Sequence, residues 1–397
     1  HSVPADAKRG AHWIKPVLVA QVRFATWTSD NLVRQASFKG LREDKPAKEV
    51  GRERVVSPEE ADTSPADAPE TPRKSASTKI KSAAAKTVKP NSPAAESLPI
   101  RLTHPDKVLD TASGMTKQIL AEYYWAIAKY MLPHIAQRPL SLVRCPEGSG
   151  KPCFFQKHKN AMLPPGVEAI DVPDRKTGKT EQYITLSTPE ALAGMAQMSV
   201  LEIHPWGSMN DDLEHPDRII FDLDPDPAIP WKVLSTAALD VRKRLKALGL
   251  ESFLKTTGGK GLHVVVPIRA EYPWPVIKQF AHAVVLQMER DQPQLYLTRM
   301  TKSARKDKIY LDYLRNDRGS TSVAAYSPRA RAGANVSMPL AWSELNSASL
   351  PTFSVHDFAT WRKRLTKDPW KDIAATPQRI TAATLRQLKI DPEVKAT

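Results

Sequence analysis

Cysteine is nearly absent from this chain of 397 residues, which contains only Cys145 and Cys153. Two cysteines provide no framework of disulfide bridges, so we expect none and a reducing compartment. Even with His158 nearby, their spacing does not match the usual pattern of zinc ligands, so zinc is not expected. No apolar run approaches the roughly 20 residues of a membrane span, and the sequence has no signal peptide. These absences favour a cytoplasmic protein that does not contact a membrane.

Acidic residues are outnumbered by basic ones. Lys plus Arg total 58 and Asp plus Glu total 43, which gives a formal net charge of +15. An excess of this size favours a polyanionic partner, most simply nucleic acid, although a basic protein without a specific partner would look the same. Apolar residues make up 41% of the chain, enough for real cores, and the length allows two or three domains. Because the chain starts at His1 rather than Met, we interpret it as part of something longer.

Aromatic residues are missing from residues 46–98, which hold seven prolines and many Ala, Ser, Lys and Glu. A segment of this composition buries too little apolar surface to offset the entropy of ordering, so we expect a disordered linker. Residues 1–45, before it, show the pattern of short strands and are too few to form a convincing core alone. Residues 99–397, after it, are predicted to form the main domain.

Helical and strand periodicities alternate along the main domain, which predicts a mixed α/β fold with helices flanking sheets. Helices are predicted at residues 115–135, 189–198, 231–248 and 275–290. Strands are predicted at residues 140–144, 154–156, 183–186, 199–204, 218–223, 252–255, 262–268 and 308–314.

An acidic pair, Asp222 and Asp224, follows the apolar run 219–221 and precedes Pro225. Side chains alternate in a strand, so both carboxylates point the same way, roughly 7 Å apart. That separation suits two divalent ions about 4 Å apart, a common arrangement for moving phosphoryl or nucleotidyl groups. Taken alone, the pattern is more typical of an acidic turn at the end of a strand.

Residues 253–263 read as a strand, a glycine loop and a second strand. Gly258 and Gly259 would let backbone N–H groups approach a phosphate closely, and the neighbouring Thr257 and Lys260 add a hydroxyl and a positive charge. His263 would begin the next strand, facing the same cleft. The pattern is not a Walker P-loop, and a glycine-rich β-turn explains it about as well.

Three further residues are candidates for a site. Asp312 lies in an otherwise apolar strand, where an isolated buried carboxylate needs a metal or a base, unless the strand is an edge with Asp312 facing solvent. Arg329 is suited to clamp a phosphate because guanidinium bonds two oxygens at once, or it is one more solvated cation. His204 ends a strand and could contact metal, phosphate or sugar, although a structural role is commoner for a lone His.

The order of these motifs is more specific than each motif alone. An Asp-x-Asp strand, a glycine loop ending in His and an apolar strand with Asp resemble the three motifs of archaeo-eukaryotic primase-type polymerases. Residues 102–109, 115–117 and 203–206 resemble the polymerase domain of bacterial DNA ligase D, an end-joining enzyme that works with Ku. The resemblance covers about residues 99–380. It departs at Asp110-Thr111, where relatives often have Tyr-Pro, which puts the shape of that loop in doubt.

The resemblance implies a primase-polymerase fold with an active-site cleft, and it implies roles for particular residues. The acidic residues would hold two Mn²⁺ or Mg²⁺ ions: Asp222, Asp224 and Asp312. A second group would bind the incoming NTP or dNTP: His204, Thr257, Gly258, Gly259, Lys260, His263 and Arg329. Two lysines would bind the 5′-phosphate of the downstream DNA strand: Lys107 and Lys117. Two aromatic residues would stack on bases: Phe154 and Phe155.

Residues 34–45 resemble the last motif of ATP-dependent DNA ligases, which stands at the end of their oligonucleotide-binding domain. Arg42 and Lys45 belong to this motif. The resemblance makes residues 1–45 a small all-β fragment of that domain. The adenylated lysine of the ligase motif Lys-x-Asp-Gly is absent, so we expect that this chain does not ligate although its parent does.

Together these features predict a template-directed nucleotidyltransferase that fills gaps and ends during non-homologous end joining, as part of a larger ATP-dependent DNA ligase. The partners implied are DNA ends with gaps, overhangs and a 5′-phosphate, Ku, and the ligase and any nuclease domain of the parent chain. Such a protein would act at the nucleoid in the bacterial cytoplasm. The alternatives are a noncatalytic module that bridges DNA ends and a metal-dependent nuclease. A nuclease needs no triphosphate clamp, so the glycine loop and Arg329 favour the polymerase.

Overall fold

The computed structural model of the chain describes residues 98–159, 163–175 and 177–393, and four short strands between Val19 and Arg42. The chain divides into two compact units, His1–Lys89 and Pro90–Thr397. Almost all of the predicted linker lies outside the described residues.

The first unit contains two pairs of antiparallel strands. Strand β1 (Val19–Arg23) pairs with β4 (Ser37–Arg42), and β2 (Thr26–Trp27) pairs with β3 (Val33–Arg34). These strands agree with the short strands expected in this part of the sequence. Arg42 is the last residue of β4, and Lys45 of the same motif lies outside the described residues.

A six-stranded sheet forms one half of the second unit. Its strands, in spatial order, are β15 (Tyr296–Leu297), β16 (Ile309–Asp312), β12 (Arg218–Pro225), β14 (Leu262–Pro267), β13 (Phe253–Thr256) and β17 (Pro339–Leu340). All neighbours are antiparallel except β15 and β16. On β12, the buried Ile219, Phe221 and Leu223 alternate with Asp222 and Asp224, so the strand has one apolar and one acidic face.

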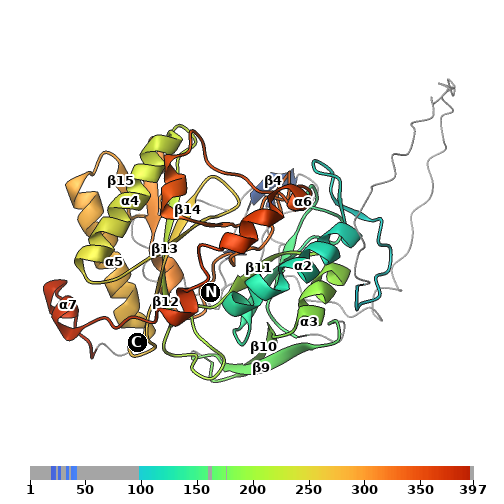
Figure 1. Ribbon diagram of the computed structural model, residues 1–397, viewed down its shortest axis with the longest axis horizontal. Coiled ribbons are helices and arrows are strands. Elements are labelled where there is room, and N and C mark those ends of the chain that lie inside the picture. The colour runs from blue at the N-terminus through green and yellow to red at the C-terminus, as the bar shows by residue number, and fades with distance from the viewer. Residues whose placement is uncertain are drawn as a thin grey trace. The chain divides into compact units, whose positions relative to one another are not determined.

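Helices α4 (Trp231–Ala247) and α5 (Trp274–Asp291) pack on this sheet and lie next to each other (Figure 1). The buried residues of α4 recur every three or four positions and form an apolar stripe: Leu234, Ala238, Val241 and Leu245. The stripe faces the sheet, and the charged residues of the helix remain on the outside.

A five-stranded sheet forms the other half of the second unit. Its main path is β11 (Val200–Pro205), β7 (Leu140–Arg144), β10 (Thr180–Leu186) and β9 (Val167–Pro173), and β8 (Phe154–Gln156) pairs with β7. Helix α2 (Lys117–Ile135) and the short α3 (Pro189–Gly194) pack together beside it (Figure 1). The side chain of Thr116 accepts a hydrogen bond from Ile119 N, and this N-cap explains why α2 begins at Lys117.

Short elements complete the unit. A small hairpin of β5 (Val108–Asp110) and β6 (Met115–Thr116) precedes α2. The other short helices are η3 (Met195–Met198), η4 (Lys302–Arg305), η5 (Leu314–Asn316), η6 (Trp342–Asn346), α6 (Phe358–Trp361), η7 (Arg362–Lys367), η8 (Ile373–Ala375) and α7 (Ala382–Gln387). Trp370 anchors the C-terminal segment, because its indole N–H donates to Leu254 O over 2.8 Å.

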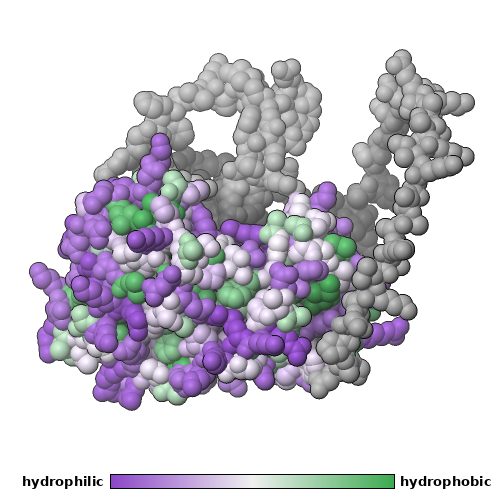
Figure 2. Space-filling view, turned by 45° about the horizontal axis from the view of Figure 1, so that its top comes forward, coloured by the Kyte–Doolittle hydropathy of each residue, from purple (hydrophilic) through white to green (hydrophobic). Residues whose placement is uncertain are grey.

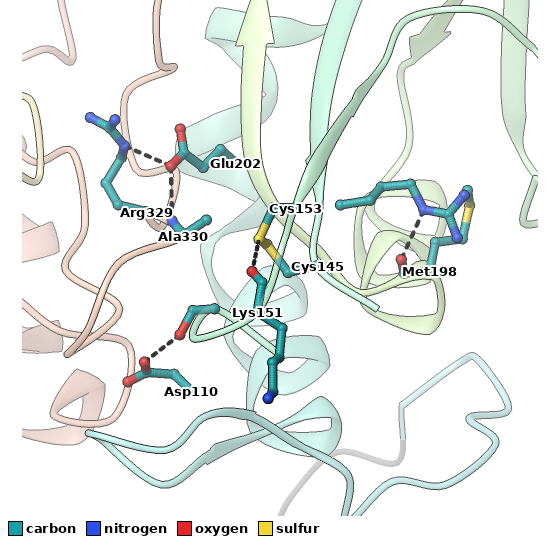
Figure 3. Close-up of a disulfide and its surroundings, with 10 residues drawn as sticks. Asp110, Cys145, Lys151, Cys153, Met198, Glu202, Arg329 and Ala330 are labelled. Carbon is teal, nitrogen blue, oxygen red and sulfur yellow. Dashed lines mark hydrogen bonds and ion pairs between the residues drawn. A yellow bond between two sulfur atoms is a disulfide. The ribbon is translucent and has the colours of Figure 1, made fainter. Parts of the chain in front are cut away.

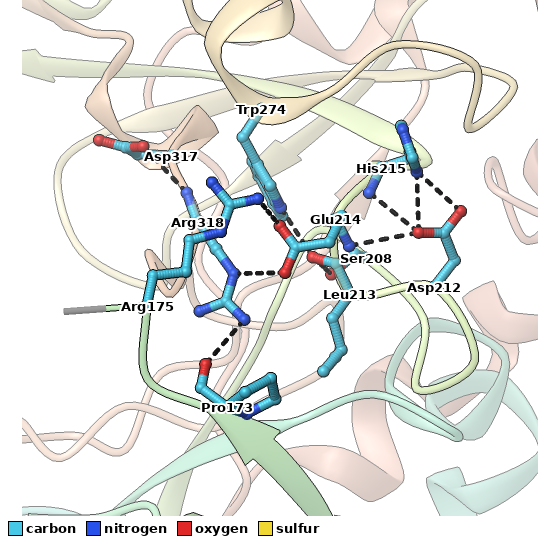
Figure 4. Close-up of polar contacts among 10 residues, drawn as sticks. All are labelled: Pro173, Arg175, Ser208, Asp212, Leu213, Glu214, His215, Trp274, Asp317 and Arg318. Atoms are coloured by element: carbon cyan, nitrogen blue, oxygen red, sulfur yellow. Dashed lines mark hydrogen bonds and ion pairs between the residues drawn. The ribbon is translucent and has the colours of Figure 1, made fainter. Parts of the chain in front are cut away.

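A group of ion pairs connects the two halves of the unit (Figure 4). Glu214 pairs with Arg175, at the tip of the β9–β10 hairpin, and with Arg318, which follows η5. Arg318 also donates to Pro173 O over 3.0 Å, and the indole N–H of Trp274 on α5 donates to Leu213 O over 2.9 Å. These contacts fix the hairpin of one sheet to the loops and helix of the other.

Most of the predicted elements are confirmed, with changes at their ends. The predicted helix 189–198 is α3 followed by the 3-10 helix η3, and it ends at Ser199 in the left-handed conformation. Strand β16 was expected to reach residue 314 but ends at Asp312, because the 3-10 helix η5 begins at Leu314. Leu314 N donates to Asp312 Oδ1 over 2.9 Å. The strand β9 was not predicted.

The expectation of no disulfide is wrong, because Cys145 and Cys153 are bonded to each other (Figure 3). Strands β7 and β8 pair with Arg144 opposite Phe154, so the next residue outward on each strand is a cysteine. Their Cα atoms lie 4.4 Å apart, a distance that allows a bridge. The spacing of the cysteines did not reveal this, because the pairing of the two strands brings them together.

Candidate active site

Four ionisable side chains form a row across the six-stranded sheet. Asp222 on β12 lies directly opposite His263 on β14 and Asp312 on β16, and Lys255 on β13 lies opposite His263. Directly opposed residues on neighbouring strands point to the same face. Asp224 is two positions from Asp222 and shares that face. The acidic trio predicted from sequence is therefore gathered on one face, and Lys255 is an addition that the sequence did not indicate.

A cavity of about 530 Å³ adjoins this face. Both sheets contribute to its lining, which includes these residues predicted for the site: Phe155, His204, Asp222, Asp224, Thr257, Lys260, His263 and Arg329. Residues that are far apart in the sequence thus meet in one place. On the face drawn in Figure 2, polar side chains are spread across the described surface and apolar ones form small separate groups.

Each carboxylate of the trio is paired with a cation. The guanidinium of Arg315 lies between two of them, with Nη2 3.0 Å from Asp312 Oδ2 and Nε 3.8 Å from Asp222 Oδ2. Asp224 lies 3.3 Å from Arg305 Nη1 and 3.4 Å from Lys260 Nζ. These cations relieve the repulsion that three neighbouring carboxylates would otherwise exert.

The two facing carboxylates have pKa shifts of opposite sign. Burial and the neighbouring charge of Asp222 raise the pKa of Asp312, and Arg315 offsets only part of this. Burial also acts to raise the pKa of Asp222, but His263 and Arg315 outweigh it, so that this pKa is lowered. Such a division is expected where two like charges share a buried site that lacks enough positive charge.

Burial makes the basic members of the row harder to protonate. Burial, with the charge of Lys255, lowers the pKa of His263 to about 4. Burial lowers the pKa of Lys255 far below its ordinary value, and its Nζ donates to Ser337 Oγ over 2.7 Å. His263 Nε2 lies 3.4 Å from Asp222 Oδ1.

The chemistry of the trio fits a divalent ion. Carboxylate oxygens are the ligands that Mg²⁺ and Mn²⁺ prefer, and three of them share one face of the sheet beside a cavity. Among the described residues, no group of three or more His, Cys, Asp or Glu side chains converges closely enough to hold a metal ion. The carboxylates are turned towards Arg315, Arg305 and Lys260 instead, so the donor set fits in kind but is engaged with these cations.

The glycine loop packs tightly against its surroundings. At Gly258, where φ is +68°, a Cβ atom would lie 2.6 Å from Arg329 Cγ and 3.0 Å from Asn335 O. At Gly261, it would lie 2.6 Å from Leu223 O. Only glycine fits at both positions, because the contacts include backbone atoms that cannot turn aside. The loop is thereby seated between β12 and the segment that carries Arg329.

Polar groups of the loop are bonded within the site. The Thr257 hydroxyl donates to Gly261 O over 3.2 Å and accepts from Gly259 N over 3.3 Å. The ammonium of Lys260 donates to Pro225 O at the end of β12. Thr257 and Lys260 therefore brace the loop, and Lys260 also lines the cavity.

A buried carboxylate that the sequence reasoning missed, Glu202, joins His204 to Arg329. Its Oε2 lies 2.7 Å from His204 Nε2, and its Oε1 lies 3.0 Å from Arg329 Nε. Arg329 also donates from Nη1 to Thr257 O over 2.6 Å. The sequence did contain an indication that Glu202 belongs to the site. Glu202 and His204 are two residues apart on a predicted strand, so their side chains must share a face.

The two lysines predicted to bind a 5′-phosphate lie together where β6 meets α2. Lys117 N donates to Lys107 O over 2.9 Å. Burial and the charge of Lys107 lower the pKa of Lys117, whose ammonium donates to Thr103 O over 2.9 Å. Lys107 Nζ lies 3.3 Å from Glu147 Oε1. The structure thus brings the two lysines together. Both precede the acidic trio by about 100 residues or more in the sequence.

Asp110, the residue that departs from the family pattern, holds the neighbouring loops together (Figure 3). Its carboxylate accepts hydrogen bonds from Ser113 Oγ and Ser149 Oγ, both over 2.6 Å, and from Gly333 N over 3.0 Å. It is almost fully buried. In this chain, Asp110 therefore fixes the loop at the position where the sequence departs from the family pattern.

Phe154 and Phe155 are exposed on β8, with 47% and 66% of their surface accessible. Large apolar side chains this exposed are available to a partner. The ring of Phe155 meets that of His204 edge to face at 5.9 Å, and Arg144 lies over the ring of Phe154 at 5.3 Å. The predicted stacking surface therefore adjoins the cavity, which Phe155 helps to line.

A family model described as the LigD primase-polymerase domain matches residues 116–370, more than half of the chain. The chain belongs to the LigD primase-polymerase family. A second model, the C-terminal region of ATP-dependent DNA ligases, matches residues 1–45. Both matches confirm the resemblance seen in the motifs. They also confirm its order along the chain, with the ligase region first and the polymerase domain after it.

Relatives of the LigD family and a solved structure support the same assignment. The multifunctional non-homologous end joining protein LigD of Pseudomonas aeruginosa is 38% identical over 97% of this chain and 43% of that protein. LigD of Mycolicibacterium smegmatis is 37% identical over 63% of this chain and 33% of that protein. The polymerase domain of Mycobacterium tuberculosis ligase D, solved in complex with DNA, has a TM-score of 0.65 and 32% identity, covering 70% of this chain and 99% of that one.

The LigD relatives are much longer than this chain, which spans less than half the length of the curated LigD proteins that it matches. The mixed α/β fold of the LigD polymerase domain is confirmed. Among the described residues, no helix has the length and apolar character needed to cross a membrane.

Proposed function

We propose that this chain is a template-directed nucleotidyltransferase that fills gaps and ends during non-homologous end joining, within a larger ATP-dependent DNA ligase. The row of Asp222, Asp312 and His263 beside a cation-lined cavity is the observation that carries this proposal. It combines carboxylates suited to divalent ions with positive charge suited to phosphates. The family's association with end joining supports the biological setting.

The acidic trio is assigned to two Mn²⁺ or Mg²⁺ ions, which would supply an activated primer hydroxyl and neutralise charge on the triphosphate. For Asp222, Asp224 and Asp312 to act as ligands, Arg315, Arg305 and Lys260 must release them. The side chains of these three cations are partly exposed and can turn towards solvent, and the incoming ions would replace the positive charge that they withdraw from the buried carboxylates.

The remaining residues of the cavity are assigned to the incoming nucleotide. Lys260 and Arg329 line the cavity and provide positive charge for the phosphates. Gly258 and Gly259 precede Lys260 in the same loop and would let its backbone approach the phosphates. Thr257 and His263 shape the same wall, and His204 supports the nucleotide from β11. The protein thereby positions the reactants and stabilises developing charge.

The DNA is assigned to the surface around the cavity. Lys107 and Lys117 would bind the 5′-phosphate of a downstream strand, and Phe154 and Phe155 would stack on bases. The net charge of +15 favours DNA generally. Ku and the ligase domain of the parent are proposed partners, at the bacterial nucleoid. Arg42 and Lys45 are assigned to the last motif of that ligase domain.

Two other functions predict different results in one assay. A nuclease would use the carboxylates without needing Lys260 and Arg329 at the same cavity, and a bridging module would need neither. The assay incubates the protein with a primed template, labelled nucleotide and Mn²⁺. We expect extension of the primer. Shortening of the primer would favour the nuclease, and DNA binding without any change in length would favour the bridging module.

A further inference from the structure

We propose that Glu202 is a positioning residue, which fixes the orientation and protonation of His204 and the direction of Arg329 at the cavity. The inference rests on the proposed function, because it treats the cavity as the nucleotide site. One carboxylate makes three contacts, with His204, Arg329 and Ala330. Neither the motifs nor the family resemblance assigns a role to Glu202.

The carboxylate of Glu202 reaches two segments of the chain. Its Oε2 bonds His204 Nε2 over 2.7 Å, on its own strand β11. Its Oε1 lies 3.0 Å from Arg329 Nε and accepts from Ala330 N over 2.8 Å, on a loop between β16 and β17. One side chain thus links the edge of one sheet to a loop of the other, and both line the cavity.

The chain around Glu202 is itself held firmly. A bulge lies between Val200 and Glu202 in the pairing of β11 with β7, and the Tyr124 hydroxyl on α2 lies 3.0 Å from Val200 O and 3.3 Å from Leu201 O. The Ser327 hydroxyl accepts from Ile203 N over 2.9 Å. The side chain of Glu202 is only 8% exposed, so it has little freedom to leave its partners.

The position of the proton on the His204 ring follows from Glu202. Burial acts to raise the pKa of Glu202, but the bond to His204 and the charge of Arg329 outweigh it and lower this pKa to about 2. The carboxylate is therefore ionised at neutral pH and can only accept. Burial lowers the pKa of His204, so its ring is neutral there. The proton must lie on Nε2, which leaves Nδ1 as an acceptor for a hydroxyl of a bound molecule.

A carboxylate in a phosphate-binding cavity carries an electrostatic disadvantage. If Glu202 were idle, neutralising it would remove a repulsion, and the nucleotide would bind more tightly. If Glu202 positions its neighbours, neutralising it removes their support instead. The two possibilities therefore predict opposite changes for the same substitution.

Glu202→Gln separates them with almost no change in size. An amide offers one acceptor and one donor in place of two acceptors. Its N–H₂ group must face either His204 Nε2 or the N–H groups of Arg329 and Ala330. The first arrangement moves the His204 proton to Nδ1, and the second places donors against donors.

Glu344→Gln is a matched control outside the cavity. Glu344 also accepts from a backbone N–H, that of Ala341 over 2.7 Å, and from the guanidinium of Arg364 over 2.6 and 2.8 Å. Loss of this carboxylate removes a similar set of contacts. Glu344→Gln should therefore reproduce the loss of stability in Glu202→Gln without affecting the cavity.

The experiment measures primer extension, thermal unfolding, and long-range proton–nitrogen NMR spectra of the His204 ring. In Glu202→Gln, we expect kcat/KM for the nucleotide to fall at least about tenfold, with the KM for primed DNA unchanged. We expect little further loss when Gln is added to a protein that already carries Arg329→Ala and His204→Ala. Glu344→Gln should extend primers like the wild type, with a similar midpoint of unfolding to Glu202→Gln.

Three results would overturn the inference: tighter nucleotide binding in Glu202→Gln, an equal additional loss in the protein lacking Arg329 and His204, or a wild-type protein whose His204 proton is not on Nε2. The NMR measurement needs no catalysis. A wild type that fails to extend primers, but whose His204 proton moves in Glu202→Gln, would therefore contradict the proposed function and leave the positioning role standing.

Discussion

At the scale of single residues, crowding of negative charge is the defining property of this site. Asp222 and Asp312 occupy opposed positions on adjacent strands, and their pKa values shift in opposite directions. A carboxylate that is buried beside another is costly unless a cation joins it. Arg315 provides part of that charge in the structure. Buried carboxylates that are only partly neutralised in this way are suited to bind divalent ions.

Asp312→Asn should therefore abolish primer extension but stabilise the fold. The raised pKa of Asp312 means that its ionised form disfavours the folded state, and this penalty is present above the pKa of the unfolded chain, near 4. Urea unfolding at pH 7 should show a more stable variant, and the difference should shrink towards pH 4. A variant less stable than the wild type at pH 7 would contradict this account of the pKa.

The acidic and basic residues that belong to sequence motifs could be predicted. Those that reach the site only because of strand pairing or a turn could not. Asp222, Asp224 and Asp312 stand out in apolar runs. Lys255 and Arg315 do not, because nothing in their local sequence shows which strand lies beside them. Their partners are set by the pairing of β13 with β14 and by the turn after β16.

At the scale of elements, the glycine loop packs closely against the loop that carries Arg329, and we expect its stability to depend on this contact. Gly258→Ala would place a methyl group against Arg329 and Asn335 as well as requiring a positive φ. Gly249 has a φ of +77°, and a Cβ atom added there would meet no atom within 4 Å, so Gly249→Ala isolates the backbone cost. We expect a loss of about 1 to 2 kcal/mol for Gly249→Ala.

Gly258→Ala should lose roughly 1 to 3 kcal/mol more than Gly249→Ala, because overpacking is added to the same backbone cost. It should also reduce primer extension, since Arg329 must move. Urea unfolding and extension assays on both variants test this. Equal losses of stability, with normal extension by Gly258→Ala, would show that the loops do not depend on this contact.

The β7–β8 hairpin is closed by the disulfide and carries the exposed phenylalanines. The bridge spans a sequence separation of 8 residues, and closing a loop of this length stabilises the folded state by about 2 to 3 kcal/mol. Cys145→Ser should lose that amount in urea unfolding, and a reductant should lower the wild type to the same level. A wild type whose stability is unaffected by reductant would contradict the prediction.

The hairpin also shows that strands can be predicted from the sequence when their pairing cannot. Strands 140–144 and 154–156 were both predicted, but their pairing was not, and the two cysteines meet only through that pairing. Strand β9 was missed because its residues are only partly buried and its apolar pattern is weak. Long helices such as α4 and α5 were predicted well, since their apolar stripes repeat over several turns.

At the scale of the whole molecule, buried neutral histidines make stability depend on pH. Burial, with the charges of Arg218 and Arg138, lowers the pKa of His134 to about 3, whereas the unfolded chain takes up its proton near pH 6.5. A base whose folded pKa is lowered costs stability as the pH falls below its unfolded pKa. The burial of His263 acts in the same direction.

We expect the free energy of unfolding to fall between pH 7.5 and pH 5, with roughly 2 kcal/mol of the loss due to His134. His134→Phe keeps an aromatic ring against Trp370, whose ring centroid lies 5.3 Å away, and removes the titration. Urea unfolding of both proteins at the two pH values measures the difference. If the variant loses as much stability as the wild type, His134 is not the cause.

The measurement that tests the central claim most directly is primer extension by Asp222→Ala, beside Asp226→Ala and with DNA binding measured for both. Asp226 is the next acidic residue beyond Pro225 and lies outside the cavity lining, where its Oδ1 accepts from Ala228 N over 2.9 Å. The account predicts that Asp222→Ala loses at least about a hundredfold in extension while binding DNA normally, and that Asp226→Ala extends primers normally. Near-normal extension by Asp222→Ala would contradict it.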